Sequence, residues 1–183
     1  IYAFAPLNYD KELDDYGLAP LGKKDTSTFF GFCGFHDTTL FSVIENNPEI
    51  TDINSDEHCF LHSYRSFAHS YHSKYEEYKL FTSKDSEVLK ILEESHGVEG
   101  IKNISEMVKV ALDDLSKPKA LLDKWIESGD YDNLEYLCIE YPYKIPVACS
   151  ASTSPCYTIN NKPINISDDP EYEYSNVITT VIP

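Results

Sequence analysis

Apolar residues recur with the period of an α-helix through most of the first two-thirds of the chain. The clearest element runs from about Asp56 to Phe81, where one face of a long amphipathic helix is apolar. This predicted core face carries Phe60, Leu61, Tyr64, Phe67, Ala68, Tyr71, Tyr75 and Tyr78. The opposite face, which we expect to be exposed to solvent, carries Ser63, Ser66, Ser70, Ser73 and Lys74.

The region before this helix predicts shorter elements. Residues 1 to 28 contain several Pro and Gly breakers, so we expect them to be irregular. The aromatic stretch TFFGFCGF that follows predicts a short strand or a tight turn. A short helix is then predicted from Asp37 or Thr38 to about Asn46, with Asp37 as its N-cap.

The region after the long helix predicts further helices and then strands. The helices are expected near residues 85 to 95, 99 to 115 and 117 to 128. Pro118 is tolerable in the first turn of the last helix, and Gly129 marks its end. Beyond it, the segments LEYLCIEY, KIPVACSAS, CYTI and SNVITTVIP have the pattern of strands.

This order of helices first and strands afterwards predicts an α+β fold. We expect a helical N-terminal two-thirds followed by an antiparallel, β-rich C-terminal part. The expected organisation is a single domain over residues 1–183, with an irregular lead-in at 1–28, a mainly helical part at 29–129 and a mainly β part at 130–183. The chain begins with Ile1 rather than Met, so we expect it to be a fragment of a longer chain.

The net charge and the hydropathy of the chain limit the kinds of partner that we expect it to bind. The 183 residues carry a formal net charge of -16, which disfavours direct binding to nucleic acid and favours a protein partner or an oligomer. No apolar run reaches the roughly 20 residues that span a bilayer, so no membrane association is expected. The five cysteines are odd in number and contain no CxxC pair, which favours a reducing cytoplasm. Cys149 and Cys156 can close a loop only in an oxidising setting.

Candidate chemistry begins at the stretch FGFCGFHD. Cys33 and His36 are three residues apart in a Gly-containing turn, a spacing that can place a thiolate and an imidazole on one zinc ion. Two further ligands would have to come from elsewhere. The alternatives are a buried thiol beside a histidine bonded to backbone, or a nucleophilic Cys33 activated by a histidine.

A third stripe on the long helix lies between its core face and its solvent face. The stripe spans roughly 80° of arc and consists of His58, His62, Arg65, His69, His72 and Glu76. His58 with His62, and His69 with His72, have spacings at which both imidazoles of a pair can face one ion. These four histidines are therefore the weaker metal-ligand candidates, and the alternative is a stripe that is solvated or paired with acids.

Arg65 is the only arginine among fifteen basic residues. Its planar guanidinium suits bidentate binding of a carboxylate, and Asp37 or Glu45 would be natural partners. The alternative is a side-chain stem packed on the core with its head group in water. Asp37, Glu45 and Arg65 are also the candidate catalytic residues, although the sequence does not decide whether the protein is an enzyme.

The segments TFFGFCGFHDTTLFSVIE and CFLHSYRSFAHSYHSK together resemble a family of uncharacterised bacterial proteins. The shared pattern is Phe-x-Gly-Phe-Cys-x-x-His-Asp, then Phe and Ile-Glu, then an aromatic helix that carries an Arg. The resemblance covers residues 26 to 76 best. It implies no established activity, and it implies that a segment bearing Cys and His, and with it the missing ligands, lay upstream.

These observations lead to one functional hypothesis and two alternatives. The hypothesis is a soluble, cytoplasmic bacterial protein with a structural zinc half-site at Cys33 and His36 that acts as a binding or regulatory module. The first alternative is a metal-dependent hydrolase, such as a nuclease of a defence system, in which the ion activates water and Arg65 holds an anionic group. The second alternative is a protein-interaction domain without metal.

Overall fold

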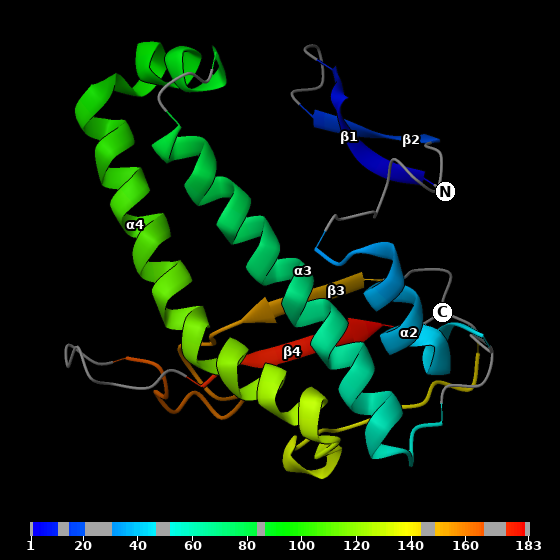
Figure 1. Ribbon diagram of the computed structural model, residues 1–183. Helices are drawn as coiled ribbons and strands as arrows, with labels where there is room; N and C mark the ends of the chain where they lie inside the picture. The colour runs from blue at the N-terminus through cyan, green and yellow to red at the C-terminus, as the bar shows by residue number, and fades with distance from the viewer. Residues whose placement is uncertain are drawn as a thin grey trace. The chain divides into compact units, whose positions relative to one another are not determined.

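The structure is a computed structural model that describes residues 2–10, 15–20, 31–46, 52–83, 87–143, 149–166 and 175–181. Contacts divide the chain into two compact units, residues 1–33 and 34–183. The α+β class is confirmed, because in the described part of the second unit helices come first and an antiparallel pair of strands follows (Figure 1). The expectation of a single domain stays a prediction.

The first unit contains an antiparallel pair of strands, β1 (Tyr2–Asp10) and β2 (Asp15–Pro20). The prediction of an irregular lead-in is therefore wrong for these two segments. The register of the pairing shifts between Phe4 and Tyr9, which interrupts the period of two by which a strand is recognised in a sequence. Pro6 lies within this irregular stretch, where a missing backbone N–H costs least.

The first helix of the second unit, α2 (Gly34–Glu45), begins earlier than predicted. Asp37 lies in its first turn and is not its N-cap, and there its carboxylate faces the positive end of the helix dipole. Gly34 does not prevent this start because glycine costs little at the beginning of a helix. Of the aromatic stretch TFFGFCGF, residues 28–30 lie outside the described residues and residues 31–32 form a bend.

The long helix α3 (Asp56–Thr82) confirms the predicted element. Ser55 caps its N-terminus by accepting a hydrogen bond from the backbone N–H of His58 at 3.4 Å. Asp56 and Glu57 place negative charge in the first turn, where it interacts favourably with the positive end of the helix dipole.

The next helix, α4 (Glu87–Ser128), contains one break at Gly97, which has φ 73° and ψ 158°. This break confirms the predicted boundary between the first two of the expected helices. The boundary predicted before Pro118 is wrong, because the helix continues through that residue and is buried against its neighbours on both sides of it. Gly129 has φ 74° and ends the helix as predicted, and the following backbone N–H donates to the carbonyl of Trp125 at 3.0 Å.

Two strands close the second unit, β3 (Cys149–Thr153) and β4 (Val177–Val181). They pair antiparallel, with Cys149 opposite Val181 and Thr153 opposite Val177. The predicted terminal strand is thus confirmed, and the described part of KIPVACSAS supplies its partner. Residues 144–148 of that segment lie outside the described residues.

The other two predicted strands are not formed. Residues 135–141, within LEYLCIEY, belong to no helix or strand, and all of them are among the described residues. CYTI contributes only an isolated bridge between Tyr157 and Pro163. LEYLCIEY therefore has the alternation of a strand but pairs with no neighbouring strand. In the described part of residues 130–183, the predicted β structure is limited to β3 and β4.

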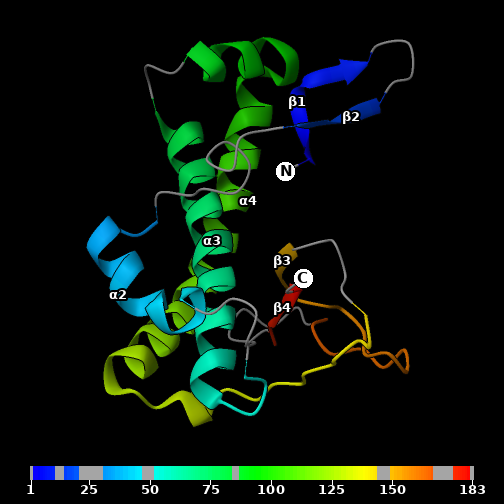
Figure 2. The same ribbon diagram turned by 90° about the vertical axis from the view of Figure 1, so that its right-hand side faces the viewer.

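The hydrophobic core of the second unit forms around α3, which contacts α2, α4, β3 and β4. Figure 1 shows α3 and α4 running side by side, and Figure 2 shows α2 and the strand pair on opposite sides of α3. The buried apolar residues are Phe41, Ile44, Cys59, Phe60, Leu61, Tyr64, Phe67, Ile101, Val108 and Leu122.

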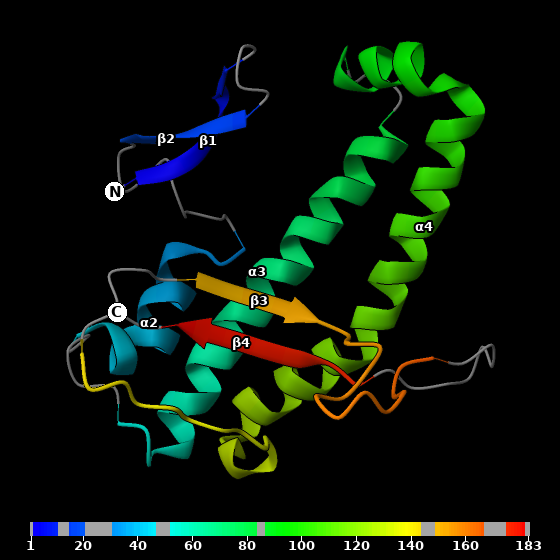
Figure 3. The same cartoon turned by 180° about the vertical axis from the view of Figure 1, so that it is seen from behind.

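The faces of α3 differ from the prediction in two places. The predicted core face is buried in its first half only, because Tyr75 is 41% exposed and Tyr78 is half-buried. Ser66, predicted to face solvent, is buried under the β3–β4 pair, which crosses α3 in the view of Figure 3. Its hydroxyl donates to the carbonyl of His62 at 2.9 Å and lies 2.7 Å from the hydroxyl of Thr180 on β4.

Candidate functional site

The structure brings together three of the residues singled out in the sequence, Arg65 on α3 and Asp37 and Glu45 on α2. The Arg65 guanidinium places Nη1 2.6 Å from Oε1 of Glu45 and Nη2 3.8 Å from Oδ1 of Asp37. Its Cζ lies 5.0 Å from the centroid of the fully buried Phe41 ring. Asp37, Phe41 and Glu45 are spaced by four residues, so they occupy one face of α2. We call these four residues the arginine clamp.

The arginine clamp confirms that Arg65 pairs with carboxylates, but it is not the bidentate pairing predicted from the sequence. One guanidinium is shared between two carboxylates, and it also covers an aromatic ring. Because both carboxylates neutralise the cation, little positive potential remains for an anionic substrate. The cluster is therefore best explained as a contact that fixes α2 on α3, with side chains that are 38% to 42% exposed.

The histidine stripe of α3 contains side chains in different environments. His58 accepts a hydrogen bond at Nδ1 from the backbone N–H of Asp52 at 3.1 Å. Burial lowers the pKa of His62, and the neighbouring His58 and Arg65 lower it further. The Nε2 atom of His62 is buried without a hydrogen-bond partner in the described structure. His72 lies 3.8 Å from a carboxylate oxygen of Glu76.

The two residues of the predicted zinc half-site belong to different units. Cys33 is exposed and belongs to the first unit, whereas His36 is exposed in the first turn of α2 in the second unit. The His36 ring has an edge contact with Phe35, with 5.6 Å between centroids. Within the described ranges, no three or more His, Cys, Asp or Glu side chains gather closely enough to hold a metal ion. Zinc binding by Cys33 and His36, or by His58, His62, His69 and His72, stays a prediction.

A feature that the sequence did not single out as a site lies in the segment Leu134–Tyr143. Its odd-numbered apolar side chains are exposed, with Leu137 at 85%, Ile139 at 68%, Tyr141 at 52% and Tyr143 at 67%. Residues 135–141 form no helix, turn or bend, and every residue from Glu135 to Tyr143 is exposed. We call Leu137, Ile139, Tyr141 and Tyr143 the apolar strip.

The even-numbered side chains of the same segment attach it to the start of α3. The hydroxyl of Tyr136 donates to Oδ1 of Asp56, and this hydrogen bond raises the pKa of Tyr136 to about 12. The Sγ of Cys138 lies 3.6 Å from the Sγ of Cys59, which is buried in the core. Tyr136 and Cys138 are themselves exposed, and through these two contacts they attach the segment to α3.

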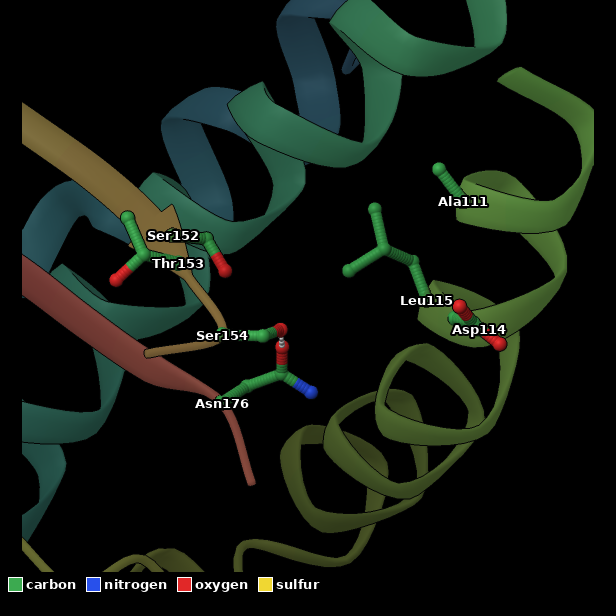
Figure 4. A pocket seen from close by; sticks show the side chains of 7 residues that line it. All are labelled: Ala111, Asp114, Leu115, Ser152, Thr153, Ser154 and Asn176. Atoms are coloured by element: carbon green, nitrogen blue, oxygen red, sulfur yellow. Dashed lines mark hydrogen bonds between the residues drawn. The ribbon is translucent and has the colours of Figure 1, made fainter. Parts of the chain in front are cut away.

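A shallow cavity of about 280 Å³ lies between α4 and the ends of the strand pair (Figure 4). Its polar wall includes Ser154, whose hydroxyl donates to Oδ1 of Asn176 at 2.6 Å. Ala111 and Leu115 of α4 form the apolar wall. Its polar groups include a pair that bonds internally, and no cationic side chain of the described residues lines it. The cavity therefore indicates no particular ligand chemistry.

Comparison with protein-family models, with curated proteins and with solved structures finds no match to this chain. The resemblance of the FGFCGFHD region to an uncharacterised bacterial family therefore stays a prediction. Among the described helices, none is both long and apolar enough to cross a membrane.

Proposed function

We propose that this protein is a binding module that takes up an extended, basic segment of a partner protein along the apolar strip. The observation that carries the proposal is that the segment Leu134–Tyr143 is attached to α3 and yet presents large apolar side chains to solvent. Tyr136 and Cys138 make the contacts with α3, and the four side chains of the apolar strip are exposed. A group of exposed apolar side chains on a strongly charged protein is typical of a contact site for another protein.

The backbone of this segment suits the addition of a strand. Residues 135–141 follow an unbent course and form no ladder with a neighbouring strand. An incoming extended peptide can pair with these backbone groups while its own alternate side chains pack against the apolar strip. The backbone then supplies affinity, and Leu137 and Ile139 supply the side-chain contacts that select the partner.

The charge around the strip favours a basic partner over a second copy of this chain. Residues 130–143 contain Asp130, Asp132, Glu135 and Glu140 and no Lys or Arg. The whole chain carries a formal charge of -16. A partner rich in Lys or Arg would be attracted to this surface, whereas a second copy would bring acidic residues against acidic residues.

The wider setting in this proposal is a bacterial cytoplasm. A reducing setting is supported by Cys59, Cys138, Cys149 and Cys156, none of which forms a disulfide in the described part of the chain. A structural zinc ion at Cys33 and His36 would belong to the same binding module. The hydrolase alternative gains no support from Arg65, because its guanidinium is already shared by Asp37 and Glu45.

The test uses a fluorescently labelled synthetic peptide of alternating valine and lysine. We expect saturable binding by fluorescence anisotropy that weakens with added salt, because part of the attraction is electrostatic. The double substitution Leu137→Asp with Ile139→Asp should weaken binding about tenfold or more. The control substitution Ile159→Asp changes an equally apolar and fully exposed residue outside the strip and should leave binding unchanged.

Three outcomes would contradict the proposal. A matching peptide of valine and glutamate that binds as well as the lysine peptide would exclude recognition of basic partners. Equal binding by wild type and by the Leu137→Asp, Ile139→Asp protein would exclude the strip. A dimer, detected by sedimentation and dissociated by the same two substitutions, would make a second copy of the chain the occupant.

A further inference from the structure

The two sulfur atoms beneath the apolar strip are close enough to react with each other. Cys59 on α3 and Cys138 on the segment Leu134–Tyr143 are separated by 79 positions in the chain, yet their Sγ atoms lie 3.6 Å apart. The Cys59 Sγ is also 3.7 Å from the carbonyl oxygen of Ile53, toward which its S–H can point. A disulfide requires an S–S distance of about 2.05 Å, so the sulfurs need to approach by only about 1.5 Å.

The surroundings give the two thiols different roles. Cys138 is exposed on a segment without regular structure, so it is accessible to a reagent in solution. Cys59 is buried at the start of α3 and is shielded from the same reagent. The pair thus has the arrangement of an attacking thiol and a resolving thiol, in contrast to a single surface cysteine.

We propose that Cys59 and Cys138 form a reversible disulfide by exchange with a low-molecular-weight disulfide, which fixes the apolar strip on α3. The Cys138 thiolate attacks the reagent, breaks its S–S bond and releases one thiol, leaving a mixed disulfide on Cys138. The Cys59 thiolate then attacks the Cys138 sulfur and releases the second thiol. The protein loses two protons and two electrons, and one small disulfide is reduced to two small thiols.

The environment of Cys59 makes the second step the slow one. Burial, the contact with Cys138 and its charge raise the pKa of Cys59 to about 11. Little Cys59 thiolate is therefore present near neutral pH, and the rate of ring closure should rise about tenfold per pH unit below that value. The pair would stay reduced in an unstressed cytoplasm and close during prolonged exposure to oxidised small thiols.

The consequence for binding rests on the function proposed above. A covalent link at Cys138 restrains the backbone of the segment and so restricts the positions of the neighbouring Leu137 and Ile139 before a partner arrives. Preorganisation of this kind removes part of the ordering cost of binding. The oxidised protein should therefore bind the valine–lysine peptide about 3- to 10-fold more tightly than the reduced protein.

The test treats the folded protein with oxidised glutathione, quenches the free thiols and maps the disulfides by peptide mass spectrometry. We expect a Cys59–Cys138 cross-link that reduced glutathione removes, together with a rise in Tm of roughly 5 to 10 °C. The substitution Cys138→Ser changes an exposed residue and should abolish both effects without unfolding the protein. The matched control Cys149→Ser also removes an exposed thiol and should retain both effects.

The outcomes separate the disulfide from its role in binding. A glutathione adduct that stays on Cys138 without closing, or a cross-link that joins other cysteines, would overturn the disulfide proposal. A Cys59–Cys138 cross-link that leaves peptide affinity unchanged would overturn the effect on binding. Absence of peptide binding by both the reduced and the oxidised protein would contradict the proposed function and leave the disulfide itself established.

Discussion

Arg65 on α3 lies with Nη1 2.6 Å from Oε1 of Glu45 on α2, and its guanidinium also covers the buried ring of Phe41. Through this one side chain, α3 contacts both a carboxylate of α2 and an aromatic ring of the hydrophobic core. Lysine could supply the charge, but its point-like ammonium cannot reach two carboxylates and cover a ring in the same geometry. The single arginine of the chain is therefore located where its shape is used.

Substitution of Arg65 should destabilise the protein modestly. We expect Arg65→Ala to lower the free energy of unfolding by about 1 to 2 kcal/mol, since partly exposed ion pairs and a ring contact are lost. A double-mutant cycle with Glu45→Gln should give a coupling energy of about 0.2 to 1 kcal/mol. Urea denaturation provides the measurement. The control Lys102→Ala removes an exposed pair with a 4.0 Å separation and should cost almost nothing, so equal effects for both variants would refute the clamp.

Tyr64 should make the stability of the protein depend on alkaline pH. Burial raises its pKa, and the hydrogen bond that it donates to Asp123 at 2.9 Å raises the pKa further. The contribution is present below the ordinary tyrosine pKa of about 10 and is lost above it, because only the unfolded chain then ionises easily.

Comparison of wild type with Tyr64→Phe isolates this effect. At pH 7 we expect the variant to be less stable by about 1 to 3 kcal/mol, because the hydrogen bond to a charged acceptor is lost. As the pH rises above about 10, the difference should shrink. Cys59 and Tyr136 titrate in both proteins and cancel in the comparison. A difference that stays constant from pH 7 to pH 11 would show that Tyr64 ionises equally well in the folded state.

The hydroxyl of Ser66 should contribute more to the stability of the protein than its position on the predicted solvent face of α3 suggests. Ser66→Ala removes a buried hydroxyl and leaves the half-buried hydroxyl of Thr180 without its partner, so a loss of about 1 to 3 kcal/mol is expected. Ser70→Ala is the matched control, since the Ser70 hydroxyl bonds to a carbonyl of its own helix at 3.2 Å. Thermal unfolding of both variants measures the difference. Equal Tm values for the two would mean that the β3–β4 pair does not rest on Ser66.

The break in α4 should depend on Gly97. Its φ of 73° and ψ of 158° define a conformation that residues with a Cβ adopt only at a cost of about 1 to 3 kcal/mol. Gly97→Ala meets no atom within 4 Å, so the expected loss of stability reflects backbone strain alone. Gly100→Ala changes a glycine inside the helix, where alanine is favoured, and should be neutral or slightly stabilising. If Gly97→Ala proved as stable as Gly100→Ala, the helix would have to be continuous at this point.

Metal content tests the zinc half-site directly. Elemental analysis of freshly purified protein should show about one equivalent of zinc, which is lost in both Cys33→Ser and His36→Ala. Cys149→Ser and His96→Ala change exposed residues elsewhere and should retain the metal. Zinc that persists in the first two variants, or is missing from the wild type, would show that Cys33 and His36 do not bind the metal.

Much of the helical part could be predicted from the sequence because its signals are local. The period of Phe60, Tyr64 and Phe67 locates α3, and Gly97 and Gly129 mark a break and an end. Even the partners of Arg65 could be named, since a lone guanidinium between two helices needs nearby carboxylates. These inferences depend on side chains that are close in the sequence, or on a charged group for which few kinds of partner are possible.

The tertiary structure decided what depends on contacts between distant segments. Ser66 is buried because β4, more than a hundred positions away, covers its face of α3. LEYLCIEY has the alternation of a strand, but alternation shows only that two faces differ, not which segment pairs with them. Only the folded chain places Cys138 against Cys59 and leaves Leu137 and Ile139 exposed, because the approach of two segments 79 positions apart is determined by packing and not by local pattern.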